Sequence, residues 1–383
     1  MADREQYYAH IGRAALALGA VGLVAFVVGL IVAPQRAWGS LMIGNYYFLA
    51  ISIGGTVFVA LNRVFGSGWA VRFRRIPEAM SAYLPIGALI LIATFLAGGS
   101  YLYPWLRQSG VAVDPHLEHK RAFLNPTMYL TLSVLTFVVW IGGSLVVRGL
   151  SRRPDSQGDA AHAGRSGRVA GAFLVLFGIT FILASFAWIM SLTPLWTSTM
   201  FPLYTFAGML TVSAAAMAVL VIRLSQHGLL PGVTRDHVYE LARLVCATAS
   251  LWAYIWFCQY VLVYYTNIPE EAIYFANRRT GPWSFLFLLN VAITWAVPAL
   301  MLITNRAQRS TRMVERACWL VLLGQWLDVT LLVVPTMGFP FRLDPLDILV
   351  PLGLVPLFLL PFMATFRGTR AVPEQGSYSL ESR

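Results

Sequence analysis

Charged residues are scarce in this sequence. Only 12% of its 383 residues are Asp, Glu, Lys or Arg, whereas 58% are hydrophobic and the mean hydropathy is +0.67. An ordinary soluble protein has roughly 25% charged residues, and a single core could not enclose so much apolar surface. The composition therefore excludes a soluble globular protein and indicates a chain embedded in lipid.

Cysteine is also scarce, and histidine is badly placed for ligating metal. Cys246, Cys258 and Cys318 form no CxxC pair, which excludes a zinc site, an iron–sulfur cluster and a disulfide framework. All six histidines lie outside the apolar runs and CxxCH is absent, so neither b-type nor c-type haem has ligands here. We expect no metal, haem or iron–sulfur cluster in this chain. Any redox chemistry must use a mobile cofactor or the cofactors of partner subunits.

Long apolar runs are what the sequence does contain. In hydrocarbon the backbone must satisfy its hydrogen bonds within each segment, so runs of about 20 residues become helices. The first run is too long for a signal peptide. We therefore predict an all-α integral membrane protein with ten transmembrane helices. The ten runs are 12–33, 41–62, 79–99, 126–147, 169–191, 200–222, 243–266, 283–304, 314–336 and 346–366.

The basic residues are distributed unequally between the two sides of these spans. The side that holds both termini has 21 Lys and Arg, and the other side has 7. Basic loops stay in the cytoplasm, so we predict a multi-pass protein of a cell inner membrane with both termini cytoplasmic. The polar stretch Arg152 to Arg168 and the tail after Arg370 are expected to be irregular cytoplasmic segments.

The second and sixth spans open with the same pattern. Trp, Ser, Met, Tyr and Phe recur at a constant offset of 158 residues, at positions 38, 40, 42, 46 and 48 and again at 196, 198, 200, 204 and 206. Duplication would give two parallel four-helix bundles, spans 2–5 and 6–9, flanked by spans 1 and 10. Aromatic belts at the membrane interface are the alternative source of such matches.

The predicted domains follow from this repeat. They are an N-terminal flanking helix at 1–33, a first bundle at 38–191 with a cytoplasmic loop at 148–168, a second bundle at 196–337, and a C-terminal flanking helix and tail at 338–383.

Three polar residues are predicted at one depth in neighbouring spans. Gln259, Asn290 and Asp328 each lie seven to nine residues from the outer end of their span, about 10–13 Å below the outer surface. Asp328 is the only carboxylate well inside any span. An acid there costs roughly 2.5–3.5 kcal/mol and needs a partner, for which Gln325, one turn away, is available.

Aromatic residues at the same level favour a flat ligand. Amide, carboxyl and stacked rings suit a head group with two carbonyl oxygens, such as a quinone or menaquinone. Asp328 is then the candidate proton acceptor, and Glu270 and Glu271 are the candidate exit. The candidate quinone-binding residues are Gln259, Asn290, Gln325, Tyr260, Trp256 and Trp295.

A structural interpretation of the same residues stays open. The polar side chains can simply bond one another between helices, with Asp328 protonated. The tryptophans can be packing residues. The outer loop that holds Glu270, Glu271, Arg278 and Arg279 can be an ordinary solvated loop.

Short stretches spread over spans 2–9 carry a resemblance to a known family. They are NYYFL at 45–49, GW at 68–69, RIPEAMSAYLP at 75–85, KRAFLN at 120–125, MSLTPLW at 190–196, STMF at 198–201, FCQY at 257–260, NIPEE at 267–271 and NVAITW at 290–295. In combination they resemble the NrfD or polysulfide-reductase-like membrane subunits. The likeness is strongest to the ActF-like members, the second and smaller subunit of this type in alternative complex III.

The resemblance implies a function. Alternative complex III is a quinol:cytochrome c oxidoreductase, so the chain would be a subunit without a redox centre of its own, not active alone. It would contribute quinol binding, a proton route or both, and would anchor an iron–sulfur subunit, c-type cytochrome subunits and a larger NrfD-like paralogue. Membrane lipid is the other expected partner, and nucleic acid is not one. A secondary transporter and a purely structural anchor are the alternatives.

Overall fold

A computed structural model describes residues 2–107, 118–152, 160–279, 281, 283–338 and 344–368, and every regular element in these ranges is a helix. The predicted all-α class is therefore confirmed. The α-helices are α1 (Ala2–Val32), α2 (Pro34–Val64), α3 (Arg75–Met80), α4 (Leu84–Leu102), α6 (Pro126–Arg152), α7 (Ala160–Trp188), α8 (Phe201–Gln226), α9 (Arg235–Thr266), α10 (Pro269–Arg279), α11 (Trp283–Val291), α12 (Val297–Met301), α13 (Asn305–Gln308), α14 (Thr311–Val333), α15 (Pro345–Gly353) and α16 (Val355–Arg367). The short 3-10 helices are η1 (Ser81–Tyr83), η2 (Pro104–Leu106), η3 (Met190–Leu192) and η5 (Val334–Met337), and η4 (Ala292–Ala296) is a π-helix.

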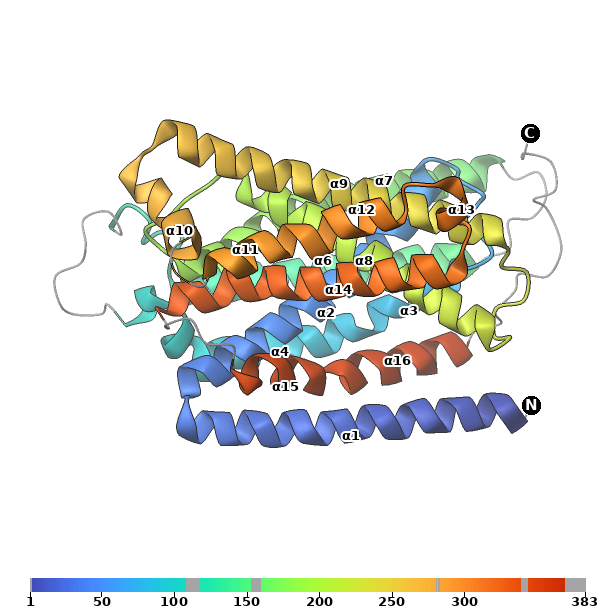
Figure 1. Ribbon diagram of the computed structural model, residues 1–383, viewed down its shortest axis with the longest axis horizontal. Helices are drawn as coiled ribbons and strands as arrows, with labels where there is room; N and C mark the ends of the chain where they lie inside the picture. Colours follow the sequence, from blue (N-terminus) through green and yellow to red (C-terminus); the bar gives the residue numbers. More distant parts are fainter. Residues whose placement is uncertain are drawn as a thin grey trace.

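Ten of the helical segments are long and apolar enough to cross a membrane, and each coincides with a predicted span. They run side by side along the long axis of the molecule (Figure 1). Several begin earlier than the apolar run. For example, α9 starts at Arg235 because Thr234 and His237 form a capping box ahead of two polar turns, which add no hydropathy signal.

The predicted irregular segment between Arg152 and Arg168 is shorter than expected. Helix α6 continues to Arg152 and α7 already begins at Ala160, so the prediction was wrong for 160–168. Small residues such as alanine favour a helix there even though hydropathy is low. Residues 153–159 and the tail after Arg370 lie outside the described part of the chain.

Helices α2 and α8 form the centre of the molecule. The apolar window of α8 is 83% buried, against 17% for α1. Gly54 of α2 leaves room for Ser213 of α8, because an added Cβ would lie 2.5 Å from Ser213 Cβ. The loops after the two helices also meet, because a Cβ added to Gly232 would lie 2.9 Å from Arg72 Nη1. The two helices therefore run in the same direction.

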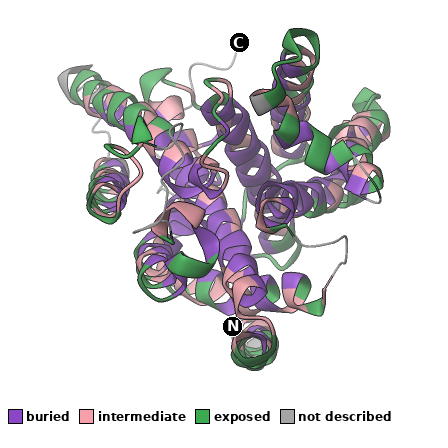
Figure 2. Ribbon diagram, turned by 90° about the vertical axis from the view of Figure 1, so that its left-hand side faces the viewer, coloured by how far each residue is buried: buried purple, intermediate pink, exposed green. Residues whose placement is uncertain are grey.

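The remaining helices are arranged around this pair. Helix α2 contacts α4 and α7, and α6 packs against both of these helices. Helix α8 contacts α9 and α14, and the α11–η4–α12 segment packs against both of these helices. Helix α1 packs on α15, α16 and α2 at the periphery, where most of its surface is exposed (Figure 2). The division into two four-helix bundles stays a prediction, because α2 also contacts α8 and α14 across it. The duplication itself stays a prediction, because Trp38 lies inside α2 whereas Trp196 precedes α8.

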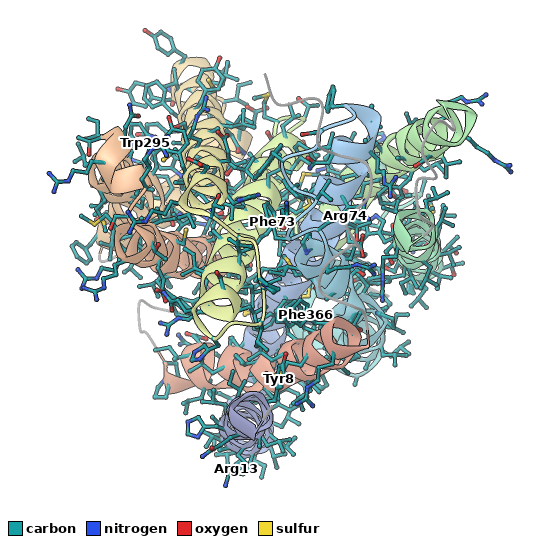
Figure 3. All side chains as sticks on the ribbon, turned by 90° about the vertical axis from the view of Figure 1, so that its right-hand side faces the viewer. Tyr8, Arg13, Phe73, Arg74, Trp295 and Phe366 are labelled. Carbon is teal, nitrogen blue, oxygen red and sulfur yellow. The ribbon has the colours of Figure 1, made fainter. Side chains whose placement is uncertain are left out.

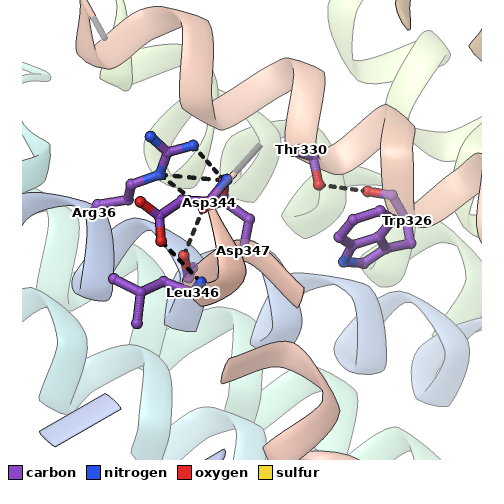
Figure 4. Close-up of polar contacts among 7 residues, drawn as sticks. Arg36, Trp326, Thr330, Asp344, Leu346 and Asp347 are labelled. Carbon is purple, nitrogen blue, oxygen red and sulfur yellow. Dashed lines mark hydrogen bonds and ion pairs between the residues drawn. The ribbon is translucent and has the colours of Figure 1, made fainter. Parts of the chain in front are cut away.

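A buried ion pair joins the starts of α2 and α15. Arg36 Nη2 lies 2.5 Å from Asp347 Oδ2, and Ser40 Oγ donates to Asp347 Oδ1 at 2.9 Å (Figure 4). At the opposite end of the molecule, Arg367 of α16 lies over the Tyr8 ring of α1, 3.8 Å from its centroid. Figure 3, which views the molecule from this end, labels Tyr8 and the neighbouring Phe366 of α16. The beginning of α1 and the end of α16 are thus on the same side.

Candidate functional site

Asp328 is the centre of a buried polar cluster formed by three helices. Its side chain is 5% exposed on α14. Its Oδ1 accepts hydrogen bonds from the Tyr204 hydroxyl of α8 and from Asn290 Nδ2 of α11, the latter at 2.7 Å. Thr294 in turn donates to Asn290 Oδ1 at 3.1 Å. The bonds from Tyr204 and Asn290 are both made to the same carboxyl oxygen.

A π-helix and a glycine bring Asn290 against α14. The π-helix Ala292–Ala296 directly follows Asn290, and such turns are rare and concentrate at functional sites. Pro298 lacks the N–H that would bond the Thr294 carbonyl in a regular helix, which favours the irregular turn. On the facing helix, a Cβ added to Gly324 would lie 2.1 Å from Thr294 Oγ1 and 3.0 Å from its Cα. The Asp328–Asn290 bond therefore depends on Gly324.

Gly324→Ala is expected to push η4 away from α14 and to destabilise the protein by about 1–3 kcal/mol, the usual cost of overpacking. Thermal unfolding of the purified chain in detergent measures the change. Gly142→Ala in α6 is the matched control, because nothing lies within 4 Å of its Cβ position. Equal unfolding temperatures for the two variants would contradict the close approach of α14 and η4.

Arg278 is the second buried charge of the site. The side chain is 3% exposed and comes from α10, a short helix at the end of the molecule opposite the N-terminus (Figure 1). Its Nε donates to Leu331 O at 2.9 Å, its Nη2 to Leu332 O at 3.3 Å and its Nη1 to Tyr274 O at 2.7 Å. Pro335, four residues beyond Leu331, has no N–H to bond the Leu331 carbonyl, so the guanidinium replaces a missing helical bond.

The guanidinium also stacks on an aromatic face. Its carbon lies 3.5 Å from the centroid of the Tyr274 ring, which itself stacks on Trp196 at 3.9 Å. Burial lowers the pKa of Arg278 and raises that of Tyr274. An arginine remains protonated even so, and it faces Asp328 across a shared cavity. The site thus combines a fixed cation with a carboxyl group that can gain or lose a proton.

The shared cavity is small. Its volume is about 20 Å³, and its wall includes Asp328, Arg278, Tyr204, Asn290 and Gln259. That volume suits one or two water molecules. Pockets that hold a drug-sized ligand are roughly 300–1,000 Å³, so a quinone ring does not fit beside Asp328 in this conformation.

The structure brings together most of the residues predicted from sequence. Asn290 and Asp328 bond directly, and Gln259 and Trp256 line the same cavity. Glu271 lines a larger neighbouring cavity that also includes Gln259. The side chain of Glu270 lies outside the described part of the structure.

Three predicted residues lie elsewhere. Gln325 was predicted as the partner of Asp328, but among the described residues its Nε2 has no hydrogen-bond partner, and Tyr204 and Asn290 replace it. Trp295 points away from the cluster, is 38% exposed and donates to Ser250 Oγ at 3.1 Å (Figure 3). Tyr260 stacks on Trp256 and faces a separate surface cavity with Arg279. Spacing along the chain gives depth and the relative directions of side chains on one helix, but it does not give which neighbouring helix each face meets.

Two residues of the site were missed at the sequence level. Tyr204 belongs to the repeated pattern of the second and sixth spans, and that position was the available signal. Arg278 was placed in an outer loop that was either solvated or functional, and it was not placed beside Asp328, because nothing in a local sequence shows that a loop helix folds back onto the bundle.

Comparison with known proteins adds no identification: no protein-family model and no curated protein matches the chain.

Proposed function

We propose that this chain is a membrane subunit of a quinol-oxidising electron-transfer complex of the alternative complex III type, and that its Asp328 cluster accepts protons. The observation that supports this most is the position of Asp328. A buried carboxyl lies between Tyr204, Asn290 and Arg278, beside a cavity of water size. Intramembrane acids of this kind commonly mark proton or ligand sites.

The chemistry of a quinol explains why a carboxyl group is useful there. Oxidation of one quinol to a quinone releases two electrons and two protons. The electrons pass to the iron–sulfur or haem centres of partner subunits, and the protons must reach water on one side of the membrane. Asp328 accepts a proton from the cavity water, and Glu271, across Gln259, continues the route toward the outer end.

A secondary transporter is less well supported. Transporters built from repeats commonly have broken helices at corresponding positions of both halves. Here the third span is interrupted at η1 and the eighth at η4. Applying the offset of 158 residues places their counterparts in α9 and α6, which are continuous.

The proposal includes a cytoplasmic location for both termini, and cysteine labelling tests it. Gln226, at the end of α8, and Asn277, on α10, are exposed near opposite ends of the molecule. An impermeant thiol reagent added to intact cells is expected to label Asn277→Cys and to leave Gln226→Cys at the level of the parent chain. The reverse pattern would show that the orientation is inverted.

Purification of the tagged chain in a mild detergent tests the complex itself. We expect proteins with c-type haem and iron–sulfur clusters to co-elute with it in fixed ratio, as haem staining and mass spectrometry will reveal. A transporter would elute alone. A structural anchor would bring the same partners, but quinol oxidation by that complex would not change when Asp328 is replaced.

A further inference from the structure

A second, larger cavity lies next to the Asp328 cluster. It is bounded by the end of α7, the turn before α8, the outer part of α9 and the start of α10, and its volume is about 460 Å³. Gln259 is the one residue that lines both cavities. The larger cavity is in the size range of ligand pockets, which the cavity at Asp328 is not.

Gln259 gives this cavity a polar group. The residue as a whole is 4% exposed, and it lines the wall of the cavity. Polar groups at such a wall form hydrogen bonds with water or with a ligand. The amide therefore suits a molecule in the cavity that can accept or donate a hydrogen bond.

The other walls define the chemical class of that molecule. Ser198, Thr199 and Glu271 supply further polar groups, while Phe186 and Met200 supply an apolar wall. Leu262, also on the wall, is 51% exposed on a membrane-spanning part of α9, so the cavity adjoins the lipid. An amphipathic molecule with a compact polar head group and an apolar tail fits this arrangement.

The charge of the cavity wall distinguishes the two main classes of amphipathic molecule, phospholipids and quinols. None of the described residues lining the cavity is Lys or Arg, and one of them is Glu271. A phospholipid phosphate would lie beside this carboxylate without a cation to compensate it. A quinol head group is uncharged and offers two hydroxyl groups, which can bond an amide at one side and a carboxylate at the other.

We infer that the cavity between α7, α9 and α10 binds the head group of an isoprenoid quinol, with Gln259 and Glu271 as its hydrogen-bonding residues. The inference rests on the proposed function for its ligand class. It moves the ligand away from Asp328, where the sequence placed it, and leaves Asp328 as a proton site reached through Gln259.

Photolabelling of the full chain in its purified complex, reconstituted in lipid nanodiscs, tests the inference with an azidoquinone probe. Peptides from residues 186–200 and 259–271 are expected to carry the label, and unlabelled decylubiquinone should displace it. Gln259→Leu removes the amide and should weaken labelling about tenfold, the effect of one lost hydrogen bond. Ser198→Phe fills the cavity and should do the same.

Leu195→Phe is the matched control, because Leu195 is 51% exposed and does not line the cavity. It should label like the parent chain. Label on other segments, or undiminished labelling of both cavity variants that elute normally, would overturn the inference. If Ser198→Phe does not fold, the inference is still tested by the peptides that are labelled in the parent chain and by the extent of labelling of Gln259→Leu.

The same experiment separates this inference from the proposed function. Labelling confined to the cavity of a chain that purifies without redox partners would retain the binding site and reject the complex. Quinol oxidation by a complex whose label maps elsewhere would retain the function and reject the site.

Discussion

Replacing Asp328 by Asn is expected to lower quinol oxidation by the assembled complex on the order of 100-fold, the usual contribution of a positioned general base. Asparagine keeps the volume of the side chain and can still accept the hydrogen bonds of Tyr204 and Asn290 at its amide oxygen. Only the titratable group is lost. Steady-state reduction of cytochrome c by decylubiquinol measures the change.

The pH profile distinguishes proton chemistry from packing. The groups that face Asp328 are Tyr204 on α8, Gln259 on α9, Tyr274 and Arg278 on α10, and Asn290 on α11. Tyrosine and arginine side chains ordinarily titrate near pH 10 or above and amides do not titrate, so removing the carboxyl group in Asp328→Asn should flatten the profile. Asp236→Asn is the control, since Asp236 is exposed and pairs with Arg309 at the other end of the bundle. A variant that assembles with unchanged rate and profile would make Asp328 structural.

Replacing Arg278 by Met is expected to cause the largest loss of stability in the half of the protein that contains α10. The change removes hydrogen bonds to the Leu331, Leu332 and Tyr274 carbonyls, and it removes the buried cation that faces Asp328. Breaking a buried charge arrangement from one side costs about 3–5 kcal/mol. Thermal unfolding followed by tryptophan fluorescence measures the loss, with exposed Arg279→Met as the control expected to change little.

A double-mutant cycle isolates the electrostatic part of this loss. Adding Asp328→Asn to Arg278→Met removes the carboxyl group that was left without its cation. We expect the double variant to be more stable than the sum of the single effects by about 0.5–3 kcal/mol, the range for residues that share one network. Additive effects would show that Arg278 acts only on the carbonyls of α14.

The membrane spans were predictable because their signal is local. Hydropathy over about 20 residues identifies each one, and the rise of a helix fixes depth, so Gln259, Asn290 and Asp328 could be placed at one level. Helix ends were less predictable. The first polar turns of α9 are helical because of a cap at Thr234, a feature outside the apolar run.

The composition of the site was less predictable because it depends on which neighbour each helix face meets and on where α10 folds back onto the bundle. Asn290 and Trp295 belong to the same segment and lie at a similar depth, but residues five apart on a helix point to different sides, and here they meet different neighbours, Asp328 and Ser250. Arg278 enters the site because α10 folds back over the bundle and meets carbonyls near Pro335. Both facts are tertiary, and no local pattern contains them.

Cavity size was also beyond the sequence. Trp256, one of the aromatic residues that favoured a quinone beside Asp328, packs against Phe287 at the cavity wall with ring centroids 4.8 Å apart, and this pair fills space that a quinone would need. The ligand-sized space lies on the other side of Gln259. The chemistry predicted for one pocket is thus distributed over two adjoining ones.

Rapid mixing of the purified complex with decylubiquinol tests the central claim most directly. If the chain is a subunit of a quinol-oxidising complex, the haem of its co-purifying partners is reduced on mixing, and Asp328→Asn slows that reduction without removing any partner. A chain that purifies free of haem proteins, or partners whose haem stays oxidised when quinol is added, would contradict the proposed function.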